Sequence, residues 1–180
     1  MRKTVAGLFI SLDGVVESPQ DWHFPYLNEE MGAAVGVQMV ESDTTLLGRR
    51  TYEEFAAYWS QQGSGVPFAD EINGAQKVVA SRSLETADWQ NSTVLGGNLA
   101  DGVRSLKEQP GKNIAITGSP TLVRALLRER LLDELRLLVH PLVVGRGRRL
   151  FTEDLDRQPL TLVESTTFST GVLNLIYRPA

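Results

Sequence analysis

The stretch LLGRRTYEEF, residues 46–55, decides the fold that this sequence predicts. Its two leucines end an apolar run typical of a buried strand, and Gly48 permits a tight turn or the close approach of a ligand. Thr51 is placed to cap a helix that follows. Backbone N–H groups at a helix N-terminus favour an anion, and the guanidinium groups of Arg49 and Arg50 add bidentate recognition of phosphate. The stretch predicts a phosphate site; the alternative is a plain connection with solubilising arginines.

A second stretch, TGSP at residues 117–120, repeats this pattern. Gly118 follows a strand-like run, Ser119 can cap a helix, and proline suits the first helical position. A third strand-like run, 77–81, is followed by Arg82. Carboxyl ends of parallel strands share one edge of a sheet, where ligands bind. We therefore expect the three polar strand ends to converge on one extended phosphorylated molecule, and a dinucleotide has the right length and charge.

The remaining segments alternate between strand and helix patterns. Such alternation predicts an α/β fold with a central, mostly parallel sheet, flanking helices and an antiparallel edge formed by the C-terminal strands. One strand leads into Gly48. The other expected strands are 5–11, 77–81, 93–95, 113–117, 135–139, 142–144, 160–167 and 172–178, and the expected helices are 29–41, 99–108 and two that follow Thr51 and Ser119.

Length and composition limit the function further. A chain of 180 residues fits a single domain, 1–180. The 18 basic and 22 acidic residues give a formal charge of −4, which disfavours nucleic acid as the main partner. The absence of cysteine excludes disulfides and thiolate chemistry, and two histidines without a carboxylate cluster predict no metal site. No apolar run has the length of a membrane span, so we expect a soluble cytoplasmic protein with no membrane partner.

Three side chains are candidates for acid–base chemistry. Asp13 follows the first strand, His23 lies in the loop 17–25, and Glu30 lies at the start of the next helix. A histidine titrates near neutrality, whereas a carboxyl needs burial to raise its pKa. Each has a structural alternative, because Asp13 forms an Asp-Gly turn pair, Glu30 suits a solvated helix face, and His23 could be an ordinary loop residue.

Other residues also allow two interpretations. Trp22 and Phe24 either form a lid or substrate wall, or plug an edge of the core. His140 lies in an apolar strand and is interpreted as a satisfied core or interface histidine. The run GRGRR at 145–149 could recognise phosphate, but a solvated connection or a dimer contact is the preferred interpretation.

Five motifs spread over nearly the whole chain carry a family resemblance. They are SLDG at 11–14, LLGRRTYEEF at 46–55, KVVASR at 77–82, ITGSPTLVRALL at 116–127 and LLDELRLLVHPLVVGRGRRLF at 131–151. The last is the most specific. Together they resemble the dihydrofolate reductase fold, and more closely the C-terminal reductase domain of bacterial bifunctional riboflavin-biosynthesis proteins.

This resemblance implies NADPH as the cofactor and a small molecule as the substrate. Gly48, Arg49 and Thr51 would hold cofactor phosphates, and Ser81 and Arg82 would flank the adenosine ribose and its 2′-phosphate. The second helix N-terminus would meet the pyrophosphate, and main-chain groups of the first strand would meet the nicotinamide. The residues implied there are Gly118, Ser119, Thr121 and Leu122 for the pyrophosphate, and Phe9 and Ile10 for the nicotinamide.

The resemblance also implies an activity. The expected function is NADPH-dependent reduction of a small heterocyclic or imine-like substrate, and 5-amino-6-(5-phosphoribosylamino)uracil reductase is the nearest named activity. Dihydrofolate reduction is the alternative enzyme, and a non-catalytic NADPH-binding or sensing module is the alternative from another class. Related domains commonly form dimers, so a homodimer through the apolar final strands is expected.

Overall fold

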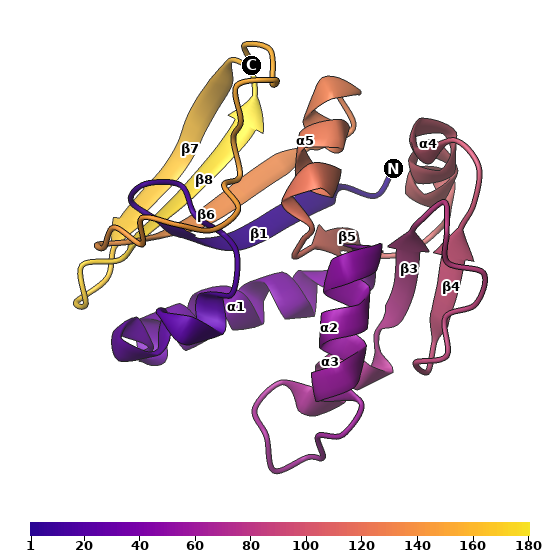
Figure 1. Ribbon diagram of the computed structural model, residues 1–180, viewed down its shortest axis with the longest axis horizontal. Coiled ribbons are helices and arrows are strands. Elements are labelled where there is room, and N and C mark those ends of the chain that lie inside the picture. The colour runs from indigo at the N-terminus through magenta and orange to yellow at the C-terminus, as the bar shows by residue number, and fades with distance from the viewer.

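A computed structural model describes all 180 residues and contains an eight-stranded sheet with five helices (Figure 1). The strand order is β4-β3-β2-β5-β1-β6-β8-β7. The strands are β1 Thr4–Ser11, β2 Ser42–Gly48, β3 Gln76–Ala80, β4 Ser92–Leu95, β5 Asn113–Ile116, β6 Glu134–His140, β7 Leu160–Thr167 and β8 Leu173–Pro179. The helices are α1 Glu29–Glu41, α2 Arg49–Trp59, α3 Ala69–Gly74, α4 Leu99–Glu108 and α5 Pro120–Arg128.

The sheet is parallel except at one edge, as the sequence predicts. The five pairings from β4 through to β6 are parallel, whereas β8 pairs antiparallel with both β6 and β7. Parallel neighbours end together, so Gly48 lies beside Ala80 and Ser11 beside His140. The turns that follow β1, β2, β3, β5 and β6 therefore share the carboxyl edge of the sheet.

Helices cover both faces of the sheet (Figure 1). On one face, apolar residues of α4 and α5 such as Val103 and Leu126 pack in the main core with strand residues such as Leu46 and Leu135. On the other face, Met31 of α1 packs near β6, and Tyr52 of α2 packs against β2 and β3. None of the five helices has the length and apolar character needed to cross a bilayer.

Most predicted elements are confirmed within a few residues, but two expectations are wrong and one helix was not predicted. The helix expected after Thr51 already begins at Arg49, with Gly48 as its N-cap and no side-chain cap, so Thr51 lies in the first turn. Residues 142–144 form no strand, because side-chain contacts described below hold them as a loop. The short helix α3, which lies between α2 and β3, was not expected.

Candidate functional site

The carboxyl ends of β2 and β5 meet in a close backbone contact. The Gly48 N–H donates to the Gly118 carbonyl at 3.1 Å. A Cβ atom on Gly48 would lie 2.5 Å from Ser119 Oγ, and one on Gly118 would lie 2.8 Å from Thr51 Oγ1. Gly118 also has φ +153°, which L side chains rarely adopt. Both glycines are therefore required by the approach of the two turns, and this approach brings four of the predicted cofactor residues together.

Two helices begin at this contact, and their N-termini differ in capping. In α5 the Ser119 hydroxyl accepts the Leu122 N–H at 3.3 Å, with Pro120 in the first turn, as the sequence predicts. In α2 no side chain caps the first turn. An uncapped helix start keeps N–H groups free and carries a partial positive charge. The start of α2 thus keeps an N–H group free that the Ser119 hydroxyl occupies at the start of α5.

Exposed arginines surround the two helix starts. Arg49 and Arg50 pair only loosely with the next turn of α2, at 3.6 Å to Glu53 and 3.4 Å to Glu54. Arg50 also lies 3.7 Å from Glu17 of the loop after β1. Exposed pairs of this kind contribute little stability, so these guanidinium groups can exchange their partners for an anion.

Two further arginines reach the start of α5, and sequence reasoning did not assign them to the site. Arg148 and Arg124 donate to Thr121 Oγ1 at 3.1 Å and 3.3 Å. The Arg148 backbone N–H donates to Glu17 Oε2 at 2.9 Å, which ties the 145–149 run to the loop after β1. The sequence allows phosphate recognition by residues 145–149. It does not show that these residues lie beside Thr121, which follows from the fold.

The third polar strand end follows β3, beside the β2 turn. Ser81 Oγ accepts the N–H groups of Ser83 and Leu84 at 3.2 Å and 3.0 Å, so its hydroxyl shapes the turn. Arg82 is exposed and has no ion-pair partner. Because Ala80 pairs with Gly48, this turn adjoins the α2 start. The guanidinium of Arg82 is free to meet a phosphate there.

Asp13 is held by the loop that follows β6. Its carboxylate accepts the N–H groups of Val144 and Gly145 at 3.0 Å and 2.9 Å and the Ser11 hydroxyl at 2.6 Å. The Ser11 hydrogen bond and the two backbone amides lower the pKa of Asp13 to about 2. A carboxyl with this pKa carries no proton at neutral pH, so these contacts favour the structural interpretation of Asp13.

Glu30 is likewise engaged in structural contacts. Its Oε2 accepts the Ser169 hydroxyl at 2.7 Å, the Ser169 N–H at 2.8 Å and the Asn28 amide at 2.8 Å. These hydrogen bonds, those from Ser169 first, lower the pKa of Glu30. Asn28 in turn caps α1 by accepting the Met31 N–H at 3.0 Å, as predicted. Glu30 therefore ties the start of α1 to the turn between β7 and β8.

His23 differs from the two carboxylates. Its ring Nδ1 is buried and makes no hydrogen bond. Its ring stacks on Phe9 of β1, with centroids 4.6 Å apart and planes 10° apart. Burial, followed by the nearby His140, lowers the pKa of His23 below 6.5. Of the two residues expected near the nicotinamide, Phe9 projects to this α1 side, whereas Ile10 is buried in the core under α5.

The two aromatic residues Trp22 and Phe24 of the 17–25 loop differ in burial. Trp22 is half-buried, its ring edge-on to His140 at 5.1 Å, and its indole N–H donates to the Glu17 carbonyl at 3.1 Å. Phe24 is 59% exposed and packs on His23 at 4.4 Å. Two single-turn 3₁₀ helices, Pro19–Asp21 and Phe24–Tyr26, carry these side chains over the carboxyl ends of β1 and β6.

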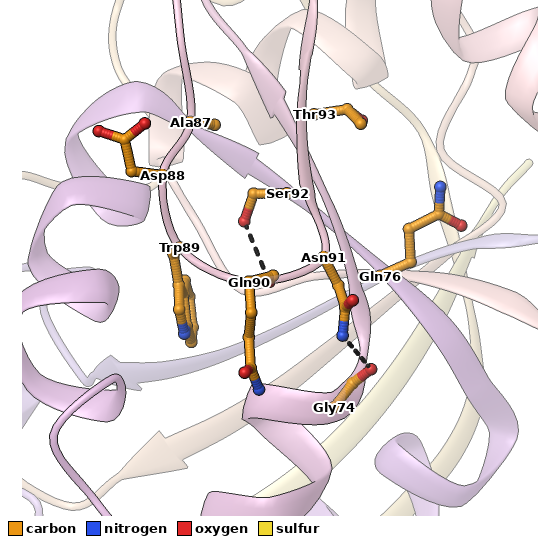
Figure 2. Close-up of a pocket in the computed structure, with 9 residues that line it drawn as sticks. All are labelled: Gly74, Gln76, Ala87, Asp88, Trp89, Gln90, Asn91, Ser92 and Thr93. Atoms are coloured by element: carbon orange, nitrogen blue, oxygen red, sulfur yellow. Dashed lines mark hydrogen bonds between the residues drawn. The ribbon is translucent and has the colours of Figure 1, made fainter.

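A separate pocket of about 630 Å³ lies at the opposite edge of the sheet (Figure 2). Gln76 and Ser92, which begin β3 and β4, are among its lining residues, so it lies away from the glycine turns. Figure 2 shows the Asn91 amide donating to the Gly74 carbonyl, at 3.0 Å, across the base of this pocket. This hydrogen bond closes the 87–93 loop onto the end of α3.

Comparison with known proteins agrees with this architecture. The model of the RibD C-terminal domain family matches residues 2–174. Protein YyaP of Bacillus subtilis (strain 168) is 29% identical over 184 residues, which covers 98% of this chain and 94% of YyaP. A putative riboflavin biosynthesis protein from Shewanella sp. PV-4 has a similar structure, with a TM-score of 0.82, 18% identity and 99% of both chains covered.

The dihydrofolate reductase of Enterococcus faecalis, solved in complex with NADP(H), also has this fold. The TM-score is 0.67 at 15% identity, over 98% of this chain and 96% of that enzyme. These structural similarities confirm the dihydrofolate reductase-like α/β fold that the motifs implied. Since the family model spans nearly every residue, the chain belongs to the family of the RibD C-terminal domain.

Proposed function

We propose that this protein is an NADPH-dependent reductase of a small heterocyclic or imine-like substrate, and that 5-amino-6-(5-phosphoribosylamino)uracil reduction is the nearest named activity. The observation that carries the proposal is the contact between Gly48 and Gly118, which brings an uncapped helix start and a second helix start to one point. Such a cradle suits a pyrophosphate, because N–H groups and helix dipoles favour negative charge.

The residues around the cradle fit a phosphorylated dinucleotide. Gly48, Arg49 and Thr51 would hold phosphate oxygens at α2, and Thr121 with Ser119 would hold them at α5. The exposed Arg82 would take the 2′-phosphate that distinguishes NADPH from NADH. Support comes from the family and the fold, which are reductase-like, and from the Enterococcus faecalis enzyme solved with NADP(H).

When bound, NADPH supplies the hydride, and the protein must position the substrate and deliver a proton to it. Among the three candidates, we assign the proton delivery to His23. The carboxylates of Asp13 and Glu30 already accept three hydrogen bonds each. The His23 ring keeps Nδ1 free and lies at the carboxyl end of the sheet beside Phe9.

Replacing Arg82 with alanine is expected to raise the Kd for NADPH roughly tenfold to a hundredfold, because a charge-assisted contact to phosphate is lost. The Kd for NADH should change little, since NADH lacks the 2′-phosphate. Isothermal titration with both cofactors measures the two constants. Arg104→Ala, at an exposed position of α4, is the matched control and should leave both unchanged. An equal loss for both cofactors would remove the assignment of Arg82.

The reductase activity is expected to fall as the pH rises, with a midpoint below 6.5. His23 can deliver a proton only while it is protonated, and burial lowers its pKa from 6.5. The measurement is kcat against pH for the wild type and for His23→Gln, which should be slower and lack this midpoint. A wild-type midpoint that persists in His23→Gln would assign the proton to another group.

The first test of the proposal is binding. Titration with NADPH and with NADH, followed by intrinsic tryptophan fluorescence, should show tighter binding of NADPH. Substrate-dependent oxidation of NADPH, assayed with aminopyrimidine and pterin compounds, then separates an enzyme from a binding module. Tight NADPH binding without oxidation across such a panel would favour the sensing alternative, and binding of neither cofactor would leave only a shared fold.

A further inference from the structure

Five rings form a cluster, here called the imidazole cluster, beside the carboxyl ends of β1 and β6. The His140 ring lies at its centre, with the edges or faces of Phe9, Trp22 and Tyr26 at centroid distances of 5.7, 5.1 and 5.5 Å. The His23 ring lies 6.2 Å from His140 and stacks on Phe9. The cluster thus holds two imidazoles within an aromatic wall.

The hydrogen bonding of His140 fixes which of its ring nitrogens carries the proton. Nδ1 lies 2.8 Å from the Leu138 carbonyl, which can only accept, so Nδ1 is the donor. Burial lowers the pKa of His140, with the Leu138 and Ile10 carbonyls opposing it, so the ring is neutral at pH 7. In a neutral ring with a proton on Nδ1, Nε2 is an acceptor.

That acceptor has no partner in the protein. His140 is fully buried, and Nε2 makes no hydrogen bond. An unsatisfied buried acceptor costs stability, and native proteins keep few of them outside functional sites. The prediction of a buried core histidine is therefore confirmed, and Nδ1 has its hydrogen bond. The prediction that the whole side chain is satisfied is wrong, because Nε2 has no partner.

The neighbouring His23 ring occupies a position on Phe9 that a planar ligand could also occupy. It lies parallel to Phe9, as a planar ligand would, and its own Nδ1 is also buried without a partner. His23 is the N-cap of the single-turn helix Phe24–Tyr26, and its ring also packs on the exposed Phe24. The His23 ring can therefore move aside for another planar ring, and stay next to it, without disturbing a strand or a long helix.

We propose that His140 is a substrate-recognition residue, whose Nε2 accepts a ring N–H from a neutral planar heterocycle that lies on Phe9, with the displaced His23 ring beside it in reach of the substrate. This inference rests on the proposed reductase function and narrows its substrate class. Lactam and imide rings, such as pyrimidinediones and pteridinediones, present such an N–H.

The local charges favour a neutral ring over a cationic one. A protonated amidine would need a carboxylate partner, and the carboxylates of Asp13 and Glu30 are committed elsewhere. Asp13 accepts from Val144 and Gly145, and Glu30 accepts from Ser169. A neutral imidazole acceptor instead matches a neutral N–H donor, and a substrate without that donor would leave Nε2 unpaired.

The test compares two ring probes, one that carries this donor and one in which a methyl group replaces it. Lumazine (pteridine-2,4-dione) carries ring N–H groups, whereas 1,3-dimethyllumazine has the same ring system with both N–H groups replaced. Binding is followed at pH 7 by quenching of tryptophan fluorescence, with and without saturating NADPH, so no turnover is needed. The wild type should bind lumazine about tenfold more tightly than the dimethyl compound.

Two variants then assign the preference to His140. His140→Phe keeps an aromatic ring but removes the acceptor, and should reduce the preference to near unity. His140→Gln restores a carbonyl acceptor and should recover part of it. Thermal melting and NADPH binding of each variant check that it is folded. Equal binding of the two probes by the wild type, or binding of neither, would overturn the inference without any variant.

These outcomes are distinguishable from failure of the reductase proposal. A protein that binds NADPH but shows no N–H preference keeps the proposed function and loses the role of His140. A protein that prefers lumazine through His140 but binds no NADPH keeps the ring site and loses the reductase. A preference that persists unchanged in a folded His140→Phe variant would overturn the assignment to His140.

Discussion

Replacing Gly48 with alanine is expected to weaken NADPH binding roughly ten- to hundredfold and to lower the free energy of unfolding by about 1–3 kcal/mol. The added Cβ would meet Ser119 Oγ at 2.5 Å, Ser119 Cβ at 3.0 Å and the Ser119 backbone nitrogen at 3.2 Å. A rotation of the serine side chain relieves only the first of these contacts. The two glycine turns must therefore separate, and the two helix starts separate with them.

The matched control for this variant is Gly32→Ala in α1. No atom lies within 4 Å of the Cβ that this substitution adds, and alanine is the better helix former. Gly32→Ala should therefore be stable and bind NADPH like the wild type. The measurements are cofactor titration and urea unfolding of both variants. A Gly48→Ala protein with unchanged NADPH affinity would show that the cradle is not the cofactor site.

Replacing Lys77 with methionine is expected to lower the free energy of unfolding by about 2 kcal/mol, because buried carbonyl groups lose their donor. Lys77 is 1% exposed, and its ammonium donates to the carbonyls of Asn73, Ala75 and Gln90 at 2.9, 2.8 and 3.1 Å. It also lies 4.2 Å from the centre of the Trp89 ring. Methionine keeps the packing on this ring and loses every donor.

The Lys77 side chain should also give the protein a distinctive alkaline response. Burial lowers its pKa from 10.5 to about 8, so between these values the unfolded chain binds more protons than the folded one. The contribution of Lys77 to the free energy of unfolding therefore rises with pH across this window. Urea unfolding at several pH values should show this rise in the wild type and in the exposed control Lys3→Met. A Lys77→Met variant with the same rise would contradict the assignment.

Lys77 is connected to the candidate site through α2, because it holds the loop against which this helix packs. Trp89 packs with Leu47 and Tyr52 in a small core behind this helix. The Trp89 backbone N–H donates to the Tyr52 hydroxyl at 3.0 Å. The lysine thus fixes the loop on which Tyr52 rests. Loss of this anchor should loosen α2 at a distance from its N-terminus, and a lower NADPH affinity would follow from it.

The fold could be predicted because its signals are local. Periodicity and turn residues mark most strands and helices, and the Ser119 cap is visible in four consecutive residues. The cradle glycines could also be found, since each ends a strand pattern. Thr51 misled the prediction because threonine favours caps in general, whereas here the extended Gly48 backbone itself starts the helix.

The rest of the site depends on contacts between distant segments. From the sequence, Asp13 is a candidate acid after the first strand. In the structure its carboxylate accepts the N–H groups of Val144 and Gly145, and this contact holds part of the strand expected at 142–144 in a loop. Arg148 donates to Thr121 of α5 in a loop that Glu17 holds by the Arg148 backbone N–H, and both partners are far away in the sequence. The unpaired Nε2 of His140 is visible only once the partners of both ring nitrogens are known.

The position of β1 within the sheet has a consequence for how the chain folds. This N-terminal strand pairs Thr4 with Ile114 on one side and Ser11 with His140 on the other. During synthesis its edges therefore stay unpaired until most of the chain has left the ribosome. Parallel pairing between such distant segments is slow and exposes strand edges to aggregation. We therefore expect this strand order to slow refolding and to raise the demand of the protein for chaperones.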